Sequence, residues 1–291
     1  MVELLNIVEK EPSMKTAKQI SRAWSNWNGK MHTFTKMLDE KGVAYLSFSK
    51  VSTVEVCPQR YLLEYVDRVK LRPEPEYFVK GRLFHEAAAK LHRARMRGRR
   101  VSLDRLIRPV ERRMYEDDAN HVRNAIDLMQ REIDPDWDVV AVEEPFVLDL
   151  GPDLPTCLGI VDLILRKGDE FAVIDHKSGK KFYESDRLQV AMYHEYAQRQ
   201  YGAERCSGYY DQYRWVNNLD RIRKPASRRT KVTIRKGTWN AVLRRIAKRY
   251  RQMKKIEQTR NADAAGDCWG CPYKNLCPRA TFEYSGNNGW Y

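Results

Sequence analysis

Two short apolar segments, joined by a polar turn, constrain the fold of this chain more than any other feature. Residues 159–164 (Gly-Ile-Val-Asp-Leu-Ile) and 171–177 (Phe-Ala-Val-Ile-Asp-His-Lys) are rich in β-branched side chains, and Lys-Gly-Asp-Glu separates them at 167–170. Segments of this kind on either side of a glycine-containing turn are typical of a β-hairpin. The sequence therefore predicts two neighbouring strands, each of which carries an aspartate.

The polar residues of this hairpin indicate a metal site. Strand side chains alternate between two faces, so Asp175 and Lys177 share one face of the second strand. A second carboxylate, Asp162, comes from the first strand. Carboxylate oxygens suit Mg²⁺ or Mn²⁺, and a nearby lysine can position or deprotonate an attacking water. A surface hairpin with an ordinary salt bridge is the alternative that these residues leave open.

The rest of the chain predicts an α/β fold, a mixed core flanked by helices. Further strands are expected over residues 137–148, about 207–216, and inside a basic loop at 221–236. Helices are expected over 47–65 with Ser47 or Ser49 as N-cap, and over 80–97, 103–131, about 187–196 and about 238–257. We assign residues 1–44 to an N-terminal helical extension, 45–265 to the core, 266–280 to a cysteine segment and 281–291 to a tail.

Side chains outside the hairpin add candidates for the same site. His85 shares a helix face with two alanines, and such small residues would let the helix sit close to a sheet. Gln189 and Tyr193 share a face of the helix that follows the hairpin. A packing histidine and ordinary helix surface are the alternatives at these positions. On the strand before the hairpin, either Glu143 or Glu144 should point toward the site, and alternation alone does not decide which.

The chain carries a large excess of positive charge. Its 53 lysines and arginines outnumber its 39 acidic residues and give a formal net charge of +14. This excess predicts an anionic partner, either nucleic acid or an acidic membrane surface. We expect a cytoplasmic protein without a membrane-spanning segment, because there is neither a secretory signal nor a stretch of about 18 apolar residues.

Two basic stretches, at 93–100 and 221–255, are candidates for nucleic-acid binding. The second stretch interleaves basic residues with Trp239 and Tyr250, and it contains the DNA-binding candidates Arg228, Arg229, Lys231 and Arg235. Basic helices are often only solvated surface, but with this net charge we favour binding to the phosphate backbone, which does not depend on base sequence.

The cysteines indicate a metal centre near the C-terminal end. Three of the six cysteines form a C-x2-C-x5-C motif at Cys268, Cys271 and Cys277. Clustered thiols in a reducing compartment imply a metal centre, and a fourth ligand must come from upstream because no histidine follows His194. Cys57 is the best candidate, since a proline follows it as it follows two of the others. The three-plus-one spacing favours an iron–sulfur cluster over a zinc site. We expect Cys157 and Cys206 to be buried thiols.

Taken together, these motifs resemble those of RecB-like nucleases, the branch of the PD-(D/E)XK superfamily that carries a C-terminal iron–sulfur cluster. This branch includes the CRISPR-associated adaptation exonuclease and the nuclease domains of AddB-type helicase–nucleases. Each motif is weak alone, but six in the same order over about residues 45–280 are specific. They are Cys57-Pro58-x-Arg60-Tyr61, Gly81-x3-His85, Gly159-x2-Asp162, Asp175-His176-Lys177, Gln189-x3-Tyr193 and the cysteine triplet. One departure is Val161-Asp162, where the superfamily name has Pro-Asp.

The resemblance implies a restriction-endonuclease-like core and a role for each site residue. His85, Asp162 and Asp175 would bind the catalytic Mg²⁺ or Mn²⁺, together with the main-chain carbonyl of His176. Lys177 would orient and activate water, and the helical pair Gln189 and Tyr193 would line the site or hold the DNA strand. A [4Fe–4S] cluster that clasps the two ends of the core would be held by Cys57, Cys268, Cys271 and Cys277.

The implied activity is metal-dependent hydrolysis of phosphodiester bonds, as an exonuclease on single-stranded DNA in recombination, repair, or phage or CRISPR DNA processing. The alternative is a non-catalytic nucleic-acid-binding protein with a structural four-cysteine metal site. No G-x4-G-K-[ST] motif occurs, so the chain has no P-loop motor. It would therefore act on strands that are already open, or with a partner helicase. Strand polarity and oligomeric state do not follow from the sequence.

Overall fold

The structure is a computed structural model that describes residues 14–25, 27, 30–182, 184, 186–214, 225–266 and 268–280. The chain divides into two compact units, each built from separate stretches of sequence. The first combines the described residues up to Tyr45 with Glu76–Val242, and the second combines Leu46–Pro75 with the described residues from Leu243 onward. Among the described residues, no helix has both the length and the apolar composition that a membrane span requires.

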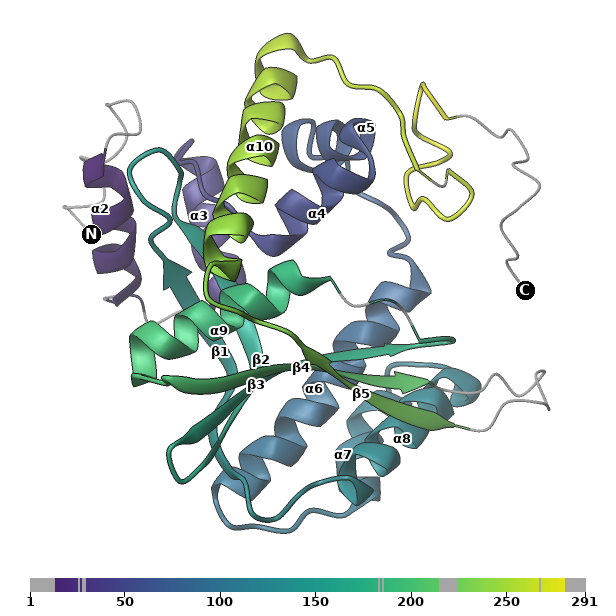
Figure 1. Cartoon of the computed structure of the whole chain (residues 1–291). Helices are drawn as coiled ribbons and strands as arrows, with labels where there is room; N and C mark the ends of the chain where they lie inside the picture. The colour runs from purple at the N-terminus through teal and green to yellow at the C-terminus, as the bar shows by residue number, and fades with distance from the viewer. Residues whose placement is uncertain are drawn as a thin grey trace. The chain divides into compact units, whose positions relative to one another are not determined.

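A five-stranded mixed sheet forms the centre of the first unit (Figure 1). The strands follow one another in sheet order as β1 (Asp138–Leu148), β2 (Cys157–Lys167), β3 (Glu170–Gly179), β4 (Arg205–Arg214) and β5 (Ala226–Val232). β3 and β4 are parallel, whereas the other neighbouring pairs are antiparallel. The predicted α/β fold with a mixed sheet is therefore confirmed.

β2 and β3 form the predicted hairpin. Lys167 pairs with Glu170, so only Gly168 and Asp169 form the turn. Gly168 has a φ of 61°, a conformation that a tight two-residue turn requires and that glycine adopts without a steric penalty. The hairpin thereby fixes the register that sets Asp162 on β2 close to Asp175 on β3.

Helices cover both faces of the sheet in the first unit (Figure 1). α9 (Arg187–Tyr201) connects β3 to the parallel strand β4 and packs on one face. The opposite face is covered by α6 (Glu76–Met96) and α8 (Glu116–Arg131), with α7 (Leu103–Glu111) packed against both helices. Apolar side chains of these three helices, such as Phe84, Ile107 and Ile126, are fully buried in one cluster.

The helix expected over 103–131 is two helices. α7 contains Pro109 and ends at Glu111, and Tyr115 then adopts an extended conformation as the N-cap of α8. α8 starts with three acidic residues, which interact favourably with the positive end of the helix dipole. A continuous helix would lose this favourable start.

The N-terminal helices of the first unit pack against the sheet. They are α2 (Met14–Ser25) and α3 (Met31–Glu40). Phe34 is fully buried in a cluster with Ile20, Leu38 and Leu158 of β2. The ring of Trp24 also meets Phe34 edge-on at 5.1 Å.

The second unit contains α4 (Phe48–Val56), α5 (Pro58–Tyr61), a short π-helix η1 (Leu62–Val66) and most of α10 (Thr238–Thr259). Ser47 caps α4 by accepting a hydrogen bond from the Lys50 N–H. The helix expected through to residue 65 is interrupted at Cys57, which is extended with φ −156° and ψ 110°. A residue before proline is disfavoured in the α-conformation, and Pro58 begins a new helix. Cys57 caps that helix, because its sulfur accepts a hydrogen bond from the Arg60 N–H.

Candidate active site

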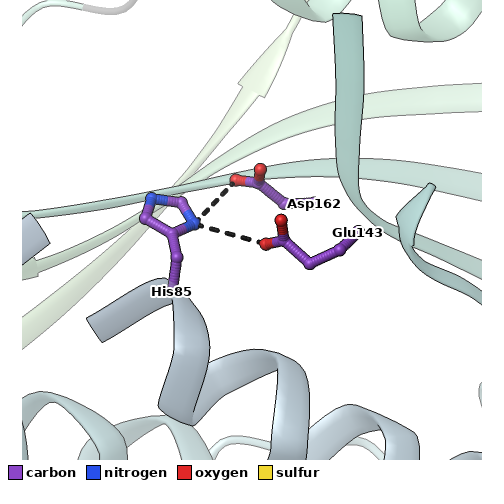
Figure 2. Close-up of side chains that lie close together, drawn as sticks. All are labelled: His85, Glu143 and Asp162. Carbon is purple, nitrogen blue, oxygen red and sulfur yellow. Dashed lines mark ion pairs between the residues drawn. The ribbon is translucent and has the colours of Figure 1, made fainter. Parts of the chain in front are cut away.

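Three ionisable side chains from three elements meet in the first unit. Nδ1 of His85 on α6 lies 3.7 Å from a carboxylate oxygen of Glu143 on β1 and 3.6 Å from one of Asp162 on β2 (Figure 2). One ligand atom of each residue lies within 4.8 Å of the others. Two carboxylates and an imidazole at this spacing are suitable ligands for a divalent metal ion.

Glu143, rather than Glu144, points into this group. The pairs Val142–Leu163 and Glu144–Val161 place Glu143 opposite Asp162. Glu143 has a φ of 51°, in the left-handed region that residues other than glycine rarely adopt, and such backbone conformations are enriched at functional sites. Sequence alternation alone could not make this choice.

A closed ring of polar contacts lies beside this group. Nζ of Lys177 lies 2.7 Å from Asp175 and donates a hydrogen bond of 3.1 Å to Oε1 of Gln189. Nε2 of Gln189 donates to the hydroxyl of Tyr193 at 2.8 Å, and this hydroxyl donates to Asp175 at 3.3 Å. The structure thus brings together four residues that the motifs singled out, and it holds the lysine and the aspartate in fixed orientations.

The backbone of His176 connects this ring to Asp162. Its N–H donates a 2.8 Å hydrogen bond to the Asp162 carboxylate. The imidazole of His176 is buried on the opposite side of the strand, where it stacks on His92 with ring centroids 5.4 Å apart. Only the main chain of His176 therefore belongs to the site.

The electrostatics of the site indicate that a cation would stabilise it. Burial, opposed by His85 and reinforced by Asp175, raises the pKa of Asp162 to about 7. Burial lowers the pKa of His85, but the carboxylates of Asp162 and Glu143 outweigh it and raise this pKa to about 9. Without a metal ion, Asp162 and His85 therefore retain protons near neutral pH. A bound metal ion would displace these protons.

Lys177 is protonated at neutral pH. Burial lowers its pKa, but Asp175 and Asp162 oppose this effect and leave the pKa above its ordinary value. An ammonium group donates hydrogen bonds but cannot remove a proton, so Lys177 is suited to orienting a water molecule or a phosphate oxygen.

The four cysteines predicted to share a metal line one cavity of the second unit. The cavity has a volume of about 240 Å³, and its lining includes Cys57, Cys268, Cys271 and Cys277. The Cys57 sulfur accepts hydrogen bonds of 3.4 Å from the N–H groups of Arg60 and Ala265. None of these thiols forms a disulfide.

Cys157 and Cys206 lie elsewhere, in the first unit. Cys157 is fully buried, as expected, whereas Cys206 is only partly buried. Burial raises the pKa of each thiol to about 12, so both are unreactive.

The structure does not place the four basic DNA-binding candidates on one surface. Alternation along β5 puts Arg228 on one face of the strand and Arg229 and Lys231 on the other. Arg229 donates two hydrogen bonds of 2.7 Å to Asp211, whose carboxylate is buried. Arg235 is exposed beyond the strand. The first part of the basic loop, residues 221–224, lies outside the described residues, as do the last two residues of the strand predicted over about 207–216.

Comparison with known proteins gives a family but no curated relative. A family model described as the PD-(D/E)XK nuclease superfamily matches residues 45–278, and no curated protein matches the chain. The chain is similar to the crystal structure of an exonuclease candidate from Eubacterium rectale, with 10% identity over 80% of this chain and 87% of that chain, and a TM-score of 0.49. It is also similar to the crystal structure of SSO0001, with 11% identity, coverage of 91% and 95%, and a TM-score of 0.38.

Proposed function

Because the chain belongs to the PD-(D/E)XK nuclease superfamily, we propose that it is a metal-dependent deoxyribonuclease. The observation that carries this proposal is the position of the Asp175–Lys177 pair next to the group of His85, Glu143 and Asp162. Leu163 pairs with Ile174, so the two aspartates come next on adjacent strands. A protein that only binds nucleic acid has no need for this combination of side chains.

The metal-binding residues in this proposal are His85, Glu143, Asp162 and Asp175, with the carbonyl of His176. A divalent ion held there would offset charge on the scissile phosphate and lower the pKa of a bound water molecule. His85 must lose its proton to act as a ligand. The His176 N–H fixes the orientation of the Asp162 carboxylate, which limits the motion of a ligand that the chemistry needs in one place.

The remaining residues act on the water and the phosphate. Lys177 carries its proton, so it donates hydrogen bonds to the attacking water or to a phosphate oxygen. Gln189 and Tyr193 are positioning residues, because their contacts hold Lys177 and Asp175 in the ring. Truncating either would loosen the ring without removing a charged group.

The activity that we propose within this class is exonucleolytic cleavage of single-stranded DNA in recombination, repair, or phage or CRISPR DNA processing. The similarity of the motifs to RecB-like nucleases supports it, as does the net charge of +14. Lacking a P-loop motif, the protein would take strands opened by a partner helicase or already open.

Linear and circular single-stranded DNA of one sequence test the exonuclease assignment. With Mg²⁺ or Mn²⁺ the protein should shorten the linear strand stepwise from an end and leave the circle intact. Equal cleavage of the circle would show an endonuclease.

We propose a [4Fe–4S] cluster for the cysteine-lined cavity. The four cysteines line one cavity of about 240 Å³, and the three-plus-one spacing of the cysteine motif supports a cluster rather than a zinc ion. The cluster would have a structural role, since the hydrolysis needs no electron transfer.

A further inference from the structure

The ring of Phe182, which follows Lys177 in the sequence, is flanked by two arginines. Phe182 follows β3, in the segment that leads to α9. The guanidinium of Arg228 on β5 lies 4.7 Å from the centroid of the Phe182 ring, and that of Arg214 at the end of β4 lies 5.2 Å from it. Two strands and the segment between β3 and α9 therefore contribute to this cluster.

The strand register places the two arginines on the face of the sheet that carries Lys177. Lys177 pairs with Gln212, and Gln212 pairs with Arg228 on the edge strand. One step further along the same face, Gly179 pairs with Arg214. Paired residues on neighbouring strands project to the same side. Arg214 and Arg228 thus lie on the face of the sheet that carries Lys177.

Exposure and contact chemistry favour a ligand at this ring. Phe182 is only half-buried, and Arg228 is exposed. An exposed contact between a guanidinium and an aromatic ring is weaker than the stacking of a nucleobase on that ring. A nucleobase can therefore compete with the Arg228 guanidinium for the face of this ring, and a guanidinium beside a stacked base is placed to bind a phosphate of the same strand.

We propose that Phe182, Arg214 and Arg228 form a nucleotide-binding subsite for single-stranded DNA. Phe182 stacks on one unpaired base near the scissile phosphate, and the arginines bind the flanking phosphates. Every base offers a stacking face, so the subsite does not select a base sequence. Paired bases are stacked within the duplex, so the subsite favours single strands. This inference rests on the proposed function and specifies how the substrate is held.

Binding of a short fluorescent single-stranded oligonucleotide, measured by anisotropy in EDTA, tests this subsite without cleavage. Phe182→Ala and Phe182→Leu should each weaken binding by roughly 5- to 150-fold. Phe182→Trp should bind as tightly as the wild type, because tryptophan keeps an aromatic face. Leucine keeps an apolar side chain but offers no stacking face, so a Phe182→Leu variant with wild-type affinity would overturn the proposal. Phe78→Ala, which removes an exposed phenylalanine on α6, is the control and should leave affinity unchanged.

A single abasic residue, moved stepwise along the oligonucleotide, provides the second test. In the wild-type protein one position should weaken binding by about the same factor as Phe182→Ala, and in Phe182→Ala that position should no longer matter. Equal losses in both proteins would overturn the subsite. A wild-type protein that binds by this pattern but never cleaves would contradict the nuclease function and leave the subsite intact, so the two failures are distinguishable.

Discussion

Glu143 and Glu144 are adjacent residues whose side chains have different partners. Glu143 faces His85 and Asp162, whereas Glu144 accepts hydrogen bonds from the hydroxyls of Tyr196 and Tyr201. We therefore expect Glu143→Gln to weaken Mn²⁺ binding on the order of tenfold or more, with little change in melting temperature. Glu144→Gln should leave Mn²⁺ affinity unchanged and lower the free energy of unfolding by about 1 kcal/mol.

Calorimetric metal titration and thermal unfolding of both variants measure these effects. Equal metal affinity of the two variants would show that Glu143 is not a ligand.

The raised pKa values of Asp162 and His85 predict how the metal-free site responds to pH. Both pKa values lie above the ordinary values of 3.8 and 6.5, at about 7 and about 9. Such groups stabilise the folded state when protonated. The Asp162 contribution is complete below about pH 4 and is lost as pH rises through 7, and that of His85 is complete below about pH 6.5 and is lost as pH rises through 9.

Metal binding must displace these protons, so the apparent affinity for Mg²⁺ should increase between about pH 6 and about pH 9. Titration calorimetry in buffers of different ionisation enthalpy measures the protons released. The Asp162→Asn variant should bind more weakly and release fewer protons on binding, because residue 162 no longer titrates and His85 loses the carboxylate that raises its pKa most. An affinity that does not change with pH would contradict this ligand set.

At the scale of elements, the edge strand β5 presents arginines with different roles on its two faces. Arg228 lies on the face of Lys177, whereas Arg229 pairs with the buried Asp211 on the other face. Arg228→Ala should reduce the slope of log affinity for single-stranded DNA against log salt concentration by about 0.7, the value for one phosphate contact. Arg229→Ala should instead leave Asp211 without its cation and lower the free energy of unfolding by about 1–3 kcal/mol.

Anisotropy titrations at several salt concentrations, with urea unfolding of each variant, separate these outcomes. A slope that falls for Arg229→Ala but not for Arg228→Ala would place the DNA on the other face of the sheet.

The elements that could be predicted from the sequence are those that their own residues and immediate neighbours determine. The β2–β3 hairpin follows from two β-branched segments and a glycine turn, and it carries Asp162 and Asp175 together. The interruption at Cys57 had a visible signal in Pro58. Alternation would also have separated Arg228 from Arg229 once residues 226–232 were recognised as a strand. The choice of Glu143 depends on a left-handed backbone conformation within β1, for which the sequence gives no signal.

At the scale of the whole molecule, the division into units could not be predicted. The second unit joins residues 46–75 to residues from 243 onward. Its contacts include the hydrogen bond from Tyr61 to Glu257 and the ion pairs from Arg245 and Arg249 to Glu55. Such contacts between distant segments depend on the tertiary fold. The cysteine motif alone anticipated this association, through the proposed link between Cys57 and the C-terminal triplet.

The proposed cluster should stabilise the second unit by joining its two segments. Cys57 and Cys268 are separated by 268 − 57 = 211 positions. If the link acts as a disulfide does, closing a loop of that length lowers the entropy of the unfolded chain and stabilises the fold by about 5 kcal/mol. We expect anaerobically purified protein to be brown, with about four irons per chain. Cys57→Ser should remove the colour and lower the melting temperature as much as Cys271→Ser does.

Iron analysis, visible absorption and thermal unfolding test this prediction. Cys206→Ser is the matched control, because Cys206 does not line the cavity, and it should keep both colour and iron. Colourless protein that contains one zinc ion per chain would contradict the cluster.

Cleavage of end-labelled single-stranded DNA by the wild-type protein and by Lys177→Ala tests the central claim most directly. The wild type should cleave with Mg²⁺ or Mn²⁺ and not in EDTA. Lys177→Ala should lose at least about 100-fold in rate yet bind DNA within about threefold of the wild type, because Lys177 acts at the reacting phosphate. Lys167→Ala, which removes a lysine from the far end of the same hairpin, should cleave normally. Cleavage by Lys177→Ala at the wild-type rate, or a wild type that binds DNA but leaves it intact with either metal, would contradict the account.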